Sequence, residues 1–157
     1  MARWISLARI VVATIGVFLG FYFVFGGHAS TAIAVVAVTT VGLVGVLAFV
    51  GHVIFYKADA RRLGWETDRP DWMFEVGFAN LAFACMALLA VIAGWGVHAQ
   101  ALTVLGFALY LLQAAILHGY RYFTDEERSP ARLWRSFLLT LLVAAMMTFL
   151  ALYALLS

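Results

Sequence analysis

The sequence predicts an all-α polytopic membrane protein, a five-transmembrane-helix bundle with a cytoplasmic N-terminus and a C-terminus outside. Three observations predict this fold class. Hydrophobic residues make up 66% of the 157 residues and charged residues only 11%, whereas soluble domains carry about 25% charged residues. The mean hydropathy is +1.01. The charged residues also fall in clusters, which leave long apolar stretches between them.

This composition excludes several classes of protein. A small soluble domain leaves too much of its surface in water to hide so much apolar area, so a soluble globular domain, a disordered chain and a nucleic-acid binder are excluded. We expect one membrane domain over residues 1–157, because no linker or repeat divides the chain. The expected partners are the lipid bilayer and either further copies of the chain or other membrane subunits, and no nucleic acid.

The charged residues lie near the N-terminus at Arg3 and Arg9, in segment 57–75 and in segment 121–135. A helix needs about 20 apolar residues to cross a bilayer. The uncharged stretches 10–56 and 76–120 are therefore long enough for two spans each, and 136–157 for one. We expect the spans at about 5–25, 31–55, 71–94, 99–121 and 132–156.

The first two helices are separated by a turn at residues 25–30, which contain Gly26 and Gly27. We expect Ser30 or Thr31 to cap the second helix, because a hydroxyl there can accept from a free backbone N–H. The segment 57–71 follows the second helix and mixes basic with acidic residues. Such mixed charge is typical of a solvated loop or docking surface.

The third helix is expected to begin near Asp68 and Pro70, as in a capping box, and to end at the turn 94–98. The fourth helix follows that turn. Ser129 and Pro130 then have the residue types of an N-cap and a first helical position, so we expect the fifth helix to begin there.

Five spans place all ten Lys and Arg residues on one side of the membrane. Basic residues are retained on the cytoplasmic side of membrane proteins. The N-terminus and both charged segments are therefore expected in the cytoplasm, and the C-terminus outside.

Three titratable side chains are expected at one depth near the cytoplasmic face. Counted from the nearest charged boundary at 1.5 Å per residue, His52, Glu75 and His118 lie roughly 4–8 Å inside their helices. One interpretation is that they only pack helices or reach the headgroups. The alternatives are a proton path and a metal or haem site, since two His and one carboxylate suit zinc or non-haem iron.

Asn80 and Gln113 form a second, deeper amide layer, at roughly 12–14 Å. We expect interhelical hydrogen bonds from these amides, with contact to a ligand as the alternative. Small residues recur at Gly16 and Gly20 in the first helix. Gly42 and Gly45 leave the surface of the second helix without side chains at two positions. They favour close helix packing, either within the chain or between copies.

The sequence contains no nucleophile elbow and no glycine-rich phosphate loop. Whether the protein is an enzyme is therefore open, with the balance against it. The leading hypothesis is a non-catalytic oligomeric or accessory subunit of a membrane complex. The alternative is a metal- or haem-binding or proton-conducting protein that uses His52, Glu75 and His118. A third hypothesis, an enzyme acting on a lipid or quinone, rests on the same polar residues.

The segment Gly64-Trp65, followed by Glu75-Val76-Gly77-Phe78-Ala79-Asn80-Leu81, resembles a family of small bacterial integral membrane proteins, a domain of unknown function. That family carries a G-W … E-V-G-F-A-N-L motif, and the match is best over residues 62–83. The resemblance implies a multi-pass protein of the cytoplasmic (inner) membrane of a bacterium. It also marks Glu75 and Asn80 as motif positions, and it supplies no activity.

Overall fold

The computed structural model describes residues 2–63, 68–124, 130 and 133–157. These residues contain no strand, and five of their helices are long and apolar enough to cross a membrane. The five are Arg3–Phe25, Ala29–Ile54, Asp71–Ile92, Gly96–Thr124 and Ser136–Leu156. The predicted all-α class and the predicted number of membrane-compatible helices are thus confirmed within the described part of the chain.

The first of these helices is α1 (Ala2–Phe25). The second consists of four consecutive segments, two of them π-helical (η): α2 (Ala29–Val36), η1 (Ala37–Leu43), α3 (Val44–Phe49) and η2 (Val50–Ile54). The remaining elements are α4 (Tyr56–Leu63), α5 (Asp71–Ile92), α6 (Gly96–Thr124), η3 (Leu133–Leu138) and α8 (Leu139–Leu156).

The π-helical turns distinguish the second helix from its neighbours. At the start of η1 the hydroxyl of Thr39 donates to the carbonyl of Val35 at 2.6 Å, a bond that competes with the backbone ladder and bends helices. The second π-helical segment, η2, carries His52. Single π-turns of this kind occur frequently at functional sites.

The turn after α1 closes the helix through its own backbone. Gly27 has φ +77°, the N–H of His28 donates to the carbonyl of Phe23 at 2.8 Å, and that of Gly27 donates to Val24. This is a Schellman motif, and glycine supplies its left-handed residue. Because the motif leads directly into α2 at Ala29, the predicted capping by Ser30 or Thr31 is wrong, and no side chain caps this helix.

The start of α5 also differs from the prediction. The helix begins at Asp71, with Pro70 at the N-cap and no capping side chain. The backbone carbonyl of Pro70 accepts from the N–H groups of Met73 and Phe74 instead, so the capping interaction predicted at Asp68 is wrong. The predicted N-cap of the fifth helix, Ser129, lies outside the described residues.

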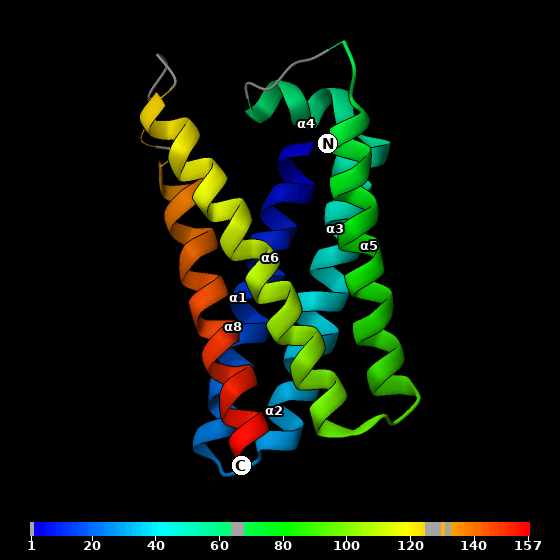
Figure 1. The fold of residues 1–157 in the computed structure, drawn as a ribbon, viewed down its shortest axis with the longest axis vertical. Helices are drawn as coiled ribbons and strands as arrows, with labels where there is room; N and C mark the ends of the chain where they lie inside the picture. Colours follow the sequence, from blue (N-terminus) through cyan, green and yellow to red (C-terminus); the bar gives the residue numbers. More distant parts are fainter. Residues whose placement is uncertain (1, 64–67, 125–129, 131–132) are drawn as a thin grey trace.

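The segment predicted as a solvated loop begins with a helix. At Phe55 the backbone leaves the helical region, with φ −109° and ψ 28°, and α4 then lies across the end of the bundle (Figure 1). Its Lys57 and Arg61 are exposed, whereas Asp59 and Ala60 are buried against the helices below. Part of this charged segment therefore belongs to the packed structure.

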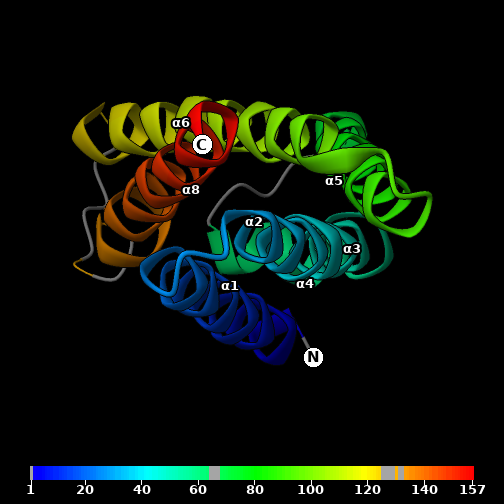
Figure 2. The same ribbon diagram turned by 90° about the horizontal axis from the view of Figure 1, so that it is seen from below.

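The helix Ala29–Ile54 lies at the centre of the bundle. Half of its most apolar window is buried, compared with 28–33% in the other four helices. Seen along the bundle, it lies between α1 on one side and α5 and α6 on the other (Figure 2). The two ends of the chain lie at opposite ends of the bundle (Figure 1). We call the end that carries α4 and the start of α1 the N-terminal end.

The apolar core fills the half of the bundle away from the N-terminal end. It comprises buried side chains of α1, α2, η1, α5, α6 and α8, the largest of which are Ile33, Phe107, Met147 and Leu150. The other half has a different interior, because the corresponding helix faces carry polar side chains.

Candidate functional site

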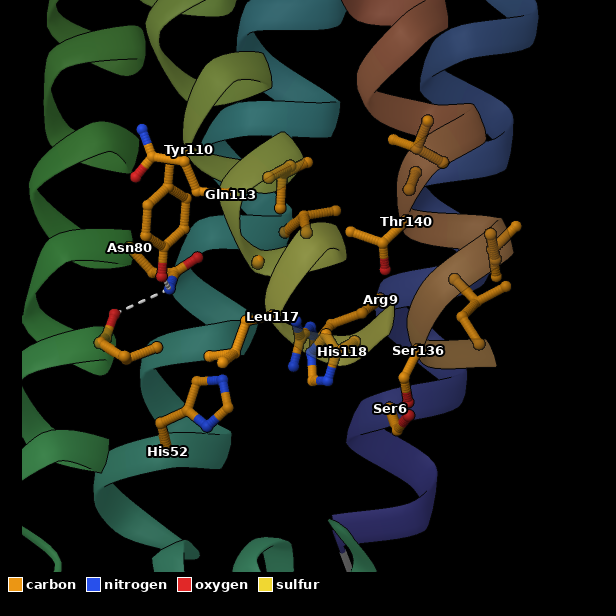
Figure 3. Close-up of a pocket in the computed structure, with 18 of the residues that line it drawn as sticks. Ser6, Arg9, His52, Asn80, Tyr110, Gln113, Leu117, His118, Ser136 and Thr140 are labelled. Atoms are coloured by element: carbon orange, nitrogen blue, oxygen red, sulfur yellow. Dashed lines mark hydrogen bonds between the residues drawn. The ribbon is translucent and has the colours of Figure 1, made fainter. Parts of the chain in front are cut away.

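Asn80 of α5 is the best-defined polar residue in the N-terminal half. It is only 4% exposed, and its side-chain nitrogen donates to the Tyr110 hydroxyl of α6 at 2.9 Å and to the Val76 carbonyl at 2.7 Å. The view of the site shows the amide directed at Tyr110 (Figure 3). A buried amide in a membrane is costly unless it is paired, so this bond joins α5 to α6. The interhelical bond predicted for Asn80 is present.

Two glycines hold the second helix close to α5 beside Asn80. A Cβ atom at Gly45 would lie 2.7 Å from the backbone oxygen of Asn80, and one at Gly77 would lie 2.5 Å from Cγ2 of Val53 and 3.3 Å from Cβ of His52. The approach of the two backbones therefore requires glycine at both positions. Gly77 and Asn80 belong to the motif noted in the sequence, so that motif holds α5 against the second helix and α6.

A cavity of about 380 Å³ lies beside this contact, surrounded by α1, the second helix, α5, α6, η3 and α8. A small-molecule site typically occupies roughly 300–1,000 Å³. The polar side chains that line the cavity are Ser6, Arg9, Thr14, His52, Asn80, Tyr110, Gln113, His118, Ser136 and Thr140, several of which are seen in Figure 3. The remaining wall is mostly aliphatic. The cavity therefore has hydrogen-bonding groups and apolar surface in the same space.

Arg9 is the one Lys, Arg, Asp or Glu side chain among the described residues that line the cavity. From the sequence, Arg9 is predicted only as a charge near the N-terminus. In the structure, α1 already begins at Ala2, so Arg9 lies about two turns inside the helix. The direction of the Arg9 side chain could have been predicted, because Ser6, Arg9 and Ala13 have the spacing of one helix face. All three residues line the cavity.

His52 connects the cavity to α4. Its Nδ1 atom lies 3.0 Å from Oδ2 of Asp59, and the two side chains are 12% and 4% exposed. The distance is that of an ion pair, although the two atoms lack the angles of a hydrogen bond. Asp59 was missed in the sequence because a charged residue in a charged segment has no local signal of burial. Its burial depends on α4 folding onto the end of the bundle.

The structure brings together four of the five predicted site residues. His52, His118, Asn80 and Gln113 line the same cavity, although the sequence places them in two layers. Residues 110–118 cover more than two turns of α6, so side chains at different depths reach one elongated space. The fifth, Glu75, is exposed on α5 and is not among the residues that line the cavity.

The described residues do not fit a metal centre built from these groups. Within that part of the chain, no three His, Cys, Asp or Glu side chains come close enough to hold a metal ion. Glu75 in particular does not complete a ligand set with His52 and His118. The free thiol Cys85 is exposed on α5 and lies away from the cavity wall.

The model of a family described as "Family of unknown function (DUF6790)" matches residues 4–155. Neither the curated proteins nor the solved structures contain a match.

Proposed function

Because the chain belongs to this family of unknown function (DUF6790), we propose a function from the cavity itself: the protein binds a small amphipathic molecule inside its helix bundle. The observation that carries this proposal is the cavity of about 380 Å³, which has both polar and aliphatic walls. Ligand sites between helices usually combine mostly apolar walls with a few polar groups that orient the ligand.

The contrast between the two halves of the bundle supports this proposal. The half beyond Val104 and Phe107 is filled by apolar side chains that are essentially inaccessible. The helices of this chain can therefore pack without leaving a cavity, as they do in the apolar half. The cavity in the other half is thus specific to the residues that surround it. Polar residues inside a membrane protein are costly and commonly mark substrate or ion pathways. Their concentration around an open space favours a ligand.

Proton conduction, the alternative expected from the sequence, is supported by His52 and His118 on the same cavity wall. The volume of the cavity, about 380 Å³, and its mostly aliphatic wall fit a small molecule. We therefore place binding of a molecule ahead of proton conduction.

The oligomeric or accessory-subunit role expected from the sequence remains a second proposal. Its support from small residues is weaker than the sequence indicated. A Cβ atom at Gly16 would meet the side chains of Thr39 and Thr40, and one at Gly20 would lie 2.6 Å from Val36 Cγ2. Both glycines therefore serve packing within the chain.

We also propose that the protein lies in the cytoplasmic membrane of a bacterium, with the N-terminal end of the bundle in the cytoplasm. The exposed basic residues Arg3, Lys57 and Arg61 support this orientation, since the start of α1 and α4 lie at that end (Figure 1). The turn at Gly26 and Gly27 at the opposite end has no charged side chain.

The experiment for the binding proposal compares two equal substitutions. Ala114→Phe fills the cavity from α6, whereas Ala145→Phe places the same ring on the exposed face of α8. Each protein is purified in a neutral maltoside detergent, and its bound small molecules are measured by native mass spectrometry. We expect a retained molecule in the unchanged protein and in A145F, and its loss in A114F.

Leu139→Trp repeats the test from α8, so the result does not depend on whether A114F folds. The proposal is overturned if the unchanged protein carries no molecule and both folded cavity variants gain stability. That outcome would identify the space as an empty packing defect, since filling a void stabilises a fold.

A further inference from the structure

The helices α5 and α6 separate from each other in the half of the bundle that contains the cavity. They are joined by the turn after Ile92 and diverge toward the N-terminal end (Figure 1). In the apolar half they are in contact. A Cβ atom at Gly106 would lie 3.3 Å from the ring of Phe83, and the rings of Phe83 and Tyr110 have centroids 5.8 Å apart. The hydrogen bond from Asn80 to Tyr110 lies farther toward the N-terminal end.

The side of α6 that makes these contacts continues along the cavity. It carries four residues at intervals of three or four, which is the spacing of one helix face: Gly106, Tyr110, Gln113 and Leu117. Gln113 lies beside Tyr110 on the side of α6 that faces α5 (Figure 3). Gln113 and Leu117 line the cavity, and both are also exposed on the surface of the bundle. Residues of the wall that are exposed mark the mouth of a cavity, so the cavity opens between α5 and α6.

The other side of this opening is formed by Trp72 and Val76 of α5. Together with Asn80 they have the spacing of one helix face, and all three line the cavity. Asn80 is buried, whereas Trp72 and Val76 are partly exposed, so exposure increases toward the N-terminal end here as it does on α6. We call the space between these two residues and Gln113 and Leu117 the α5–α6 opening.

The α5–α6 opening lies within helices that can span a membrane. Gln113 is about 12 Å along α6 from Arg121, well inside the span. The exposed residues around the opening include the apolar Phe78 of α5 and Ile116 of α6, as expected for a surface in contact with hydrocarbon. The opening therefore faces the bilayer and not the water at the end of the bundle.

The Gln113 amide differs from the other two amides of this helix pair. Asn80 donates to the Tyr110 hydroxyl, and Gln100 donates to the Ala90 carbonyl at 3.5 Å, so both bonds join α5 to α6. Within the described part of the chain, the Gln113 side chain makes no such bond. An amide in apolar surroundings costs free energy unless it is paired. The amide is therefore available to a polar group of a ligand at the opening.

We propose, on the basis of the binding function above, that the ligand is an amphiphile dissolved in the bilayer, which enters the cavity sideways through the α5–α6 opening. Its head carries a hydroxyl or carbonyl oxygen, to which the Gln113 amide donates a hydrogen bond. Its hydrocarbon chain lies against aliphatic residues of the wall such as Leu111 and Val143. A molecule that stays in water has no access by this route.

The test follows the entry of a photoactivatable dodecanol, which dissolves in the bilayer and carries a diazirine on its chain. The full chain is reconstituted in phosphatidylcholine vesicles, the probe is added, and samples are irradiated after increasing times. Tandem mass spectrometry then measures the label on Leu111 and Val143, which line the cavity. A photoactivatable triethylene glycol, which has hydroxyl groups and stays in water, is the comparison. We expect the cavity to be labelled by dodecanol and not by the glycol.

Two substitutions close the α5–α6 opening, Gln113→Trp and Leu117→Trp. Both positions are exposed, so the fold can accommodate the larger ring, and each variant is a check on the other. Entry then requires a conformational change, so we expect labelling of the cavity to be about tenfold slower. Ile116→Trp is the matched control, because Ile116 is exposed on the same helix and does not line the cavity. Its labelling rate should be unchanged.

Gln113→Leu removes the amide and leaves the opening unfilled. Its effect is measured as the labelling by dodecanol relative to that by a photoactivatable dodecane, which has no hydroxyl. We expect this preference to fall about fivefold, as for the loss of one neutral hydrogen bond. An unchanged preference would show that the head of the ligand does not bond Gln113.

Three outcomes overturn the entry proposal and leave the binding function in place. An unchanged labelling rate in both tryptophan variants would place entry elsewhere. Slowing by Thr14→Trp instead would place it beside α1, where Thr14 is exposed and lines the cavity. Labelling by the glycol as fast as by dodecanol would show access from water. Absence of label from both probes, with no molecule retained in the native spectra, would contradict the binding function itself.

Discussion

Nδ1 of His52 lies 3.0 Å from Oδ2 of Asp59, and this contact attaches α4 to the end of the second helix. The two side chains are nearly excluded from solvent. Substitution of one therefore affects stability differently from substitution of the other, because each leaves a different group buried. Removal of the imidazole leaves a buried carboxylate without that contact, whereas removal of the carboxylate charge leaves a ring that can be neutral.

We therefore expect His52→Leu to lower the free energy of unfolding by about 3 kcal/mol, and Asp59→Asn by only about 1 kcal/mol. The double variant with leucine at both positions should be more stable than His52→Leu alone. Unfolding in mixed detergent micelles, followed by circular dichroism, measures all three. Asp68→Asn, at an exposed carboxylate, is the control. An Asp59→Asn loss as large as that of His52→Leu would contradict this account.

The glycines beside the site give a second prediction, because two of them differ in what a methyl group would meet. A Cβ at Gly77 would approach Val53 Cγ2 at 2.5 Å, whereas one at Gly51 would meet only Ile5 Cγ2 at 3.8 Å. Gly77→Ala should thus cost about 1–3 kcal/mol through overpacking. Gly51→Ala should be neutral or stabilising by about 0.5 kcal/mol, since alanine favours a helix.

Thermal unfolding of the two alanine variants in the same detergent distinguishes these effects. Equal destabilisation at both positions would show that α5 and the second helix do not approach each other closely at Gly77. The comparison also tests why the sequence motif contains glycine there, because the close approach fixes the position of Asn80 relative to α6.

The overall fold was predictable because its signals are local. Five apolar stretches separated by charge clusters and glycine turns are read directly along the chain. The membrane-compatible helices of the described residues begin and end within four residues of the predicted spans. The details that failed, the caps at Ser30 or Thr31 and at Asp68, were decided by backbone hydrogen bonds of the adjoining residues.

The candidate site was predictable only in part. His52, Asn80, Gln113 and His118 stood out because polar side chains are rare in apolar helices. Arg9 was assigned to the boundary because distance along the chain, and not the direction of the side chain, was counted. The burial of Asp59 arises from the docking of α4, which no local pattern encodes.

The Asn80–Tyr110 hydrogen bond gives a third prediction. Interhelical hydrogen bonds in membrane proteins are worth about 0.6 kcal/mol on average and up to roughly 1.7. Because this donor is buried and bonded at 2.9 Å, we expect a coupling energy of about 1 kcal/mol in a double-mutant cycle of Asn80→Ala and Tyr110→Phe. Tyr120→Phe, at an exposed phenol of the same helix, should have no effect.

A coupling energy near zero would mean that the amide and the phenol do not depend on each other for pairing. The cycle is measured by unfolding in micelles, so its readout does not require knowledge of the ligand.

The proposed orientation gives a fourth prediction. The bundle has five membrane-compatible helices, and the described ends of the chain lie at opposite ends of it (Figure 1). The exposed Lys57 and Arg61 of α4 lie at the N-terminal end, and the retention of basic residues in the cytoplasm supports the proposed cytoplasmic location of that end. A fluorescent reporter that folds only in the cytoplasm should be bright when it is inserted after Arg69 and dark when it is fused after Ser157.

Alkaline phosphatase at the same two positions should give the opposite pattern. A reporter after Ser157 that behaves as cytoplasmic would contradict the five-span arrangement. The test also bears on ligand entry, since Ser6, Arg9 and Ser136 lie toward the end that faces the cytoplasm in this orientation.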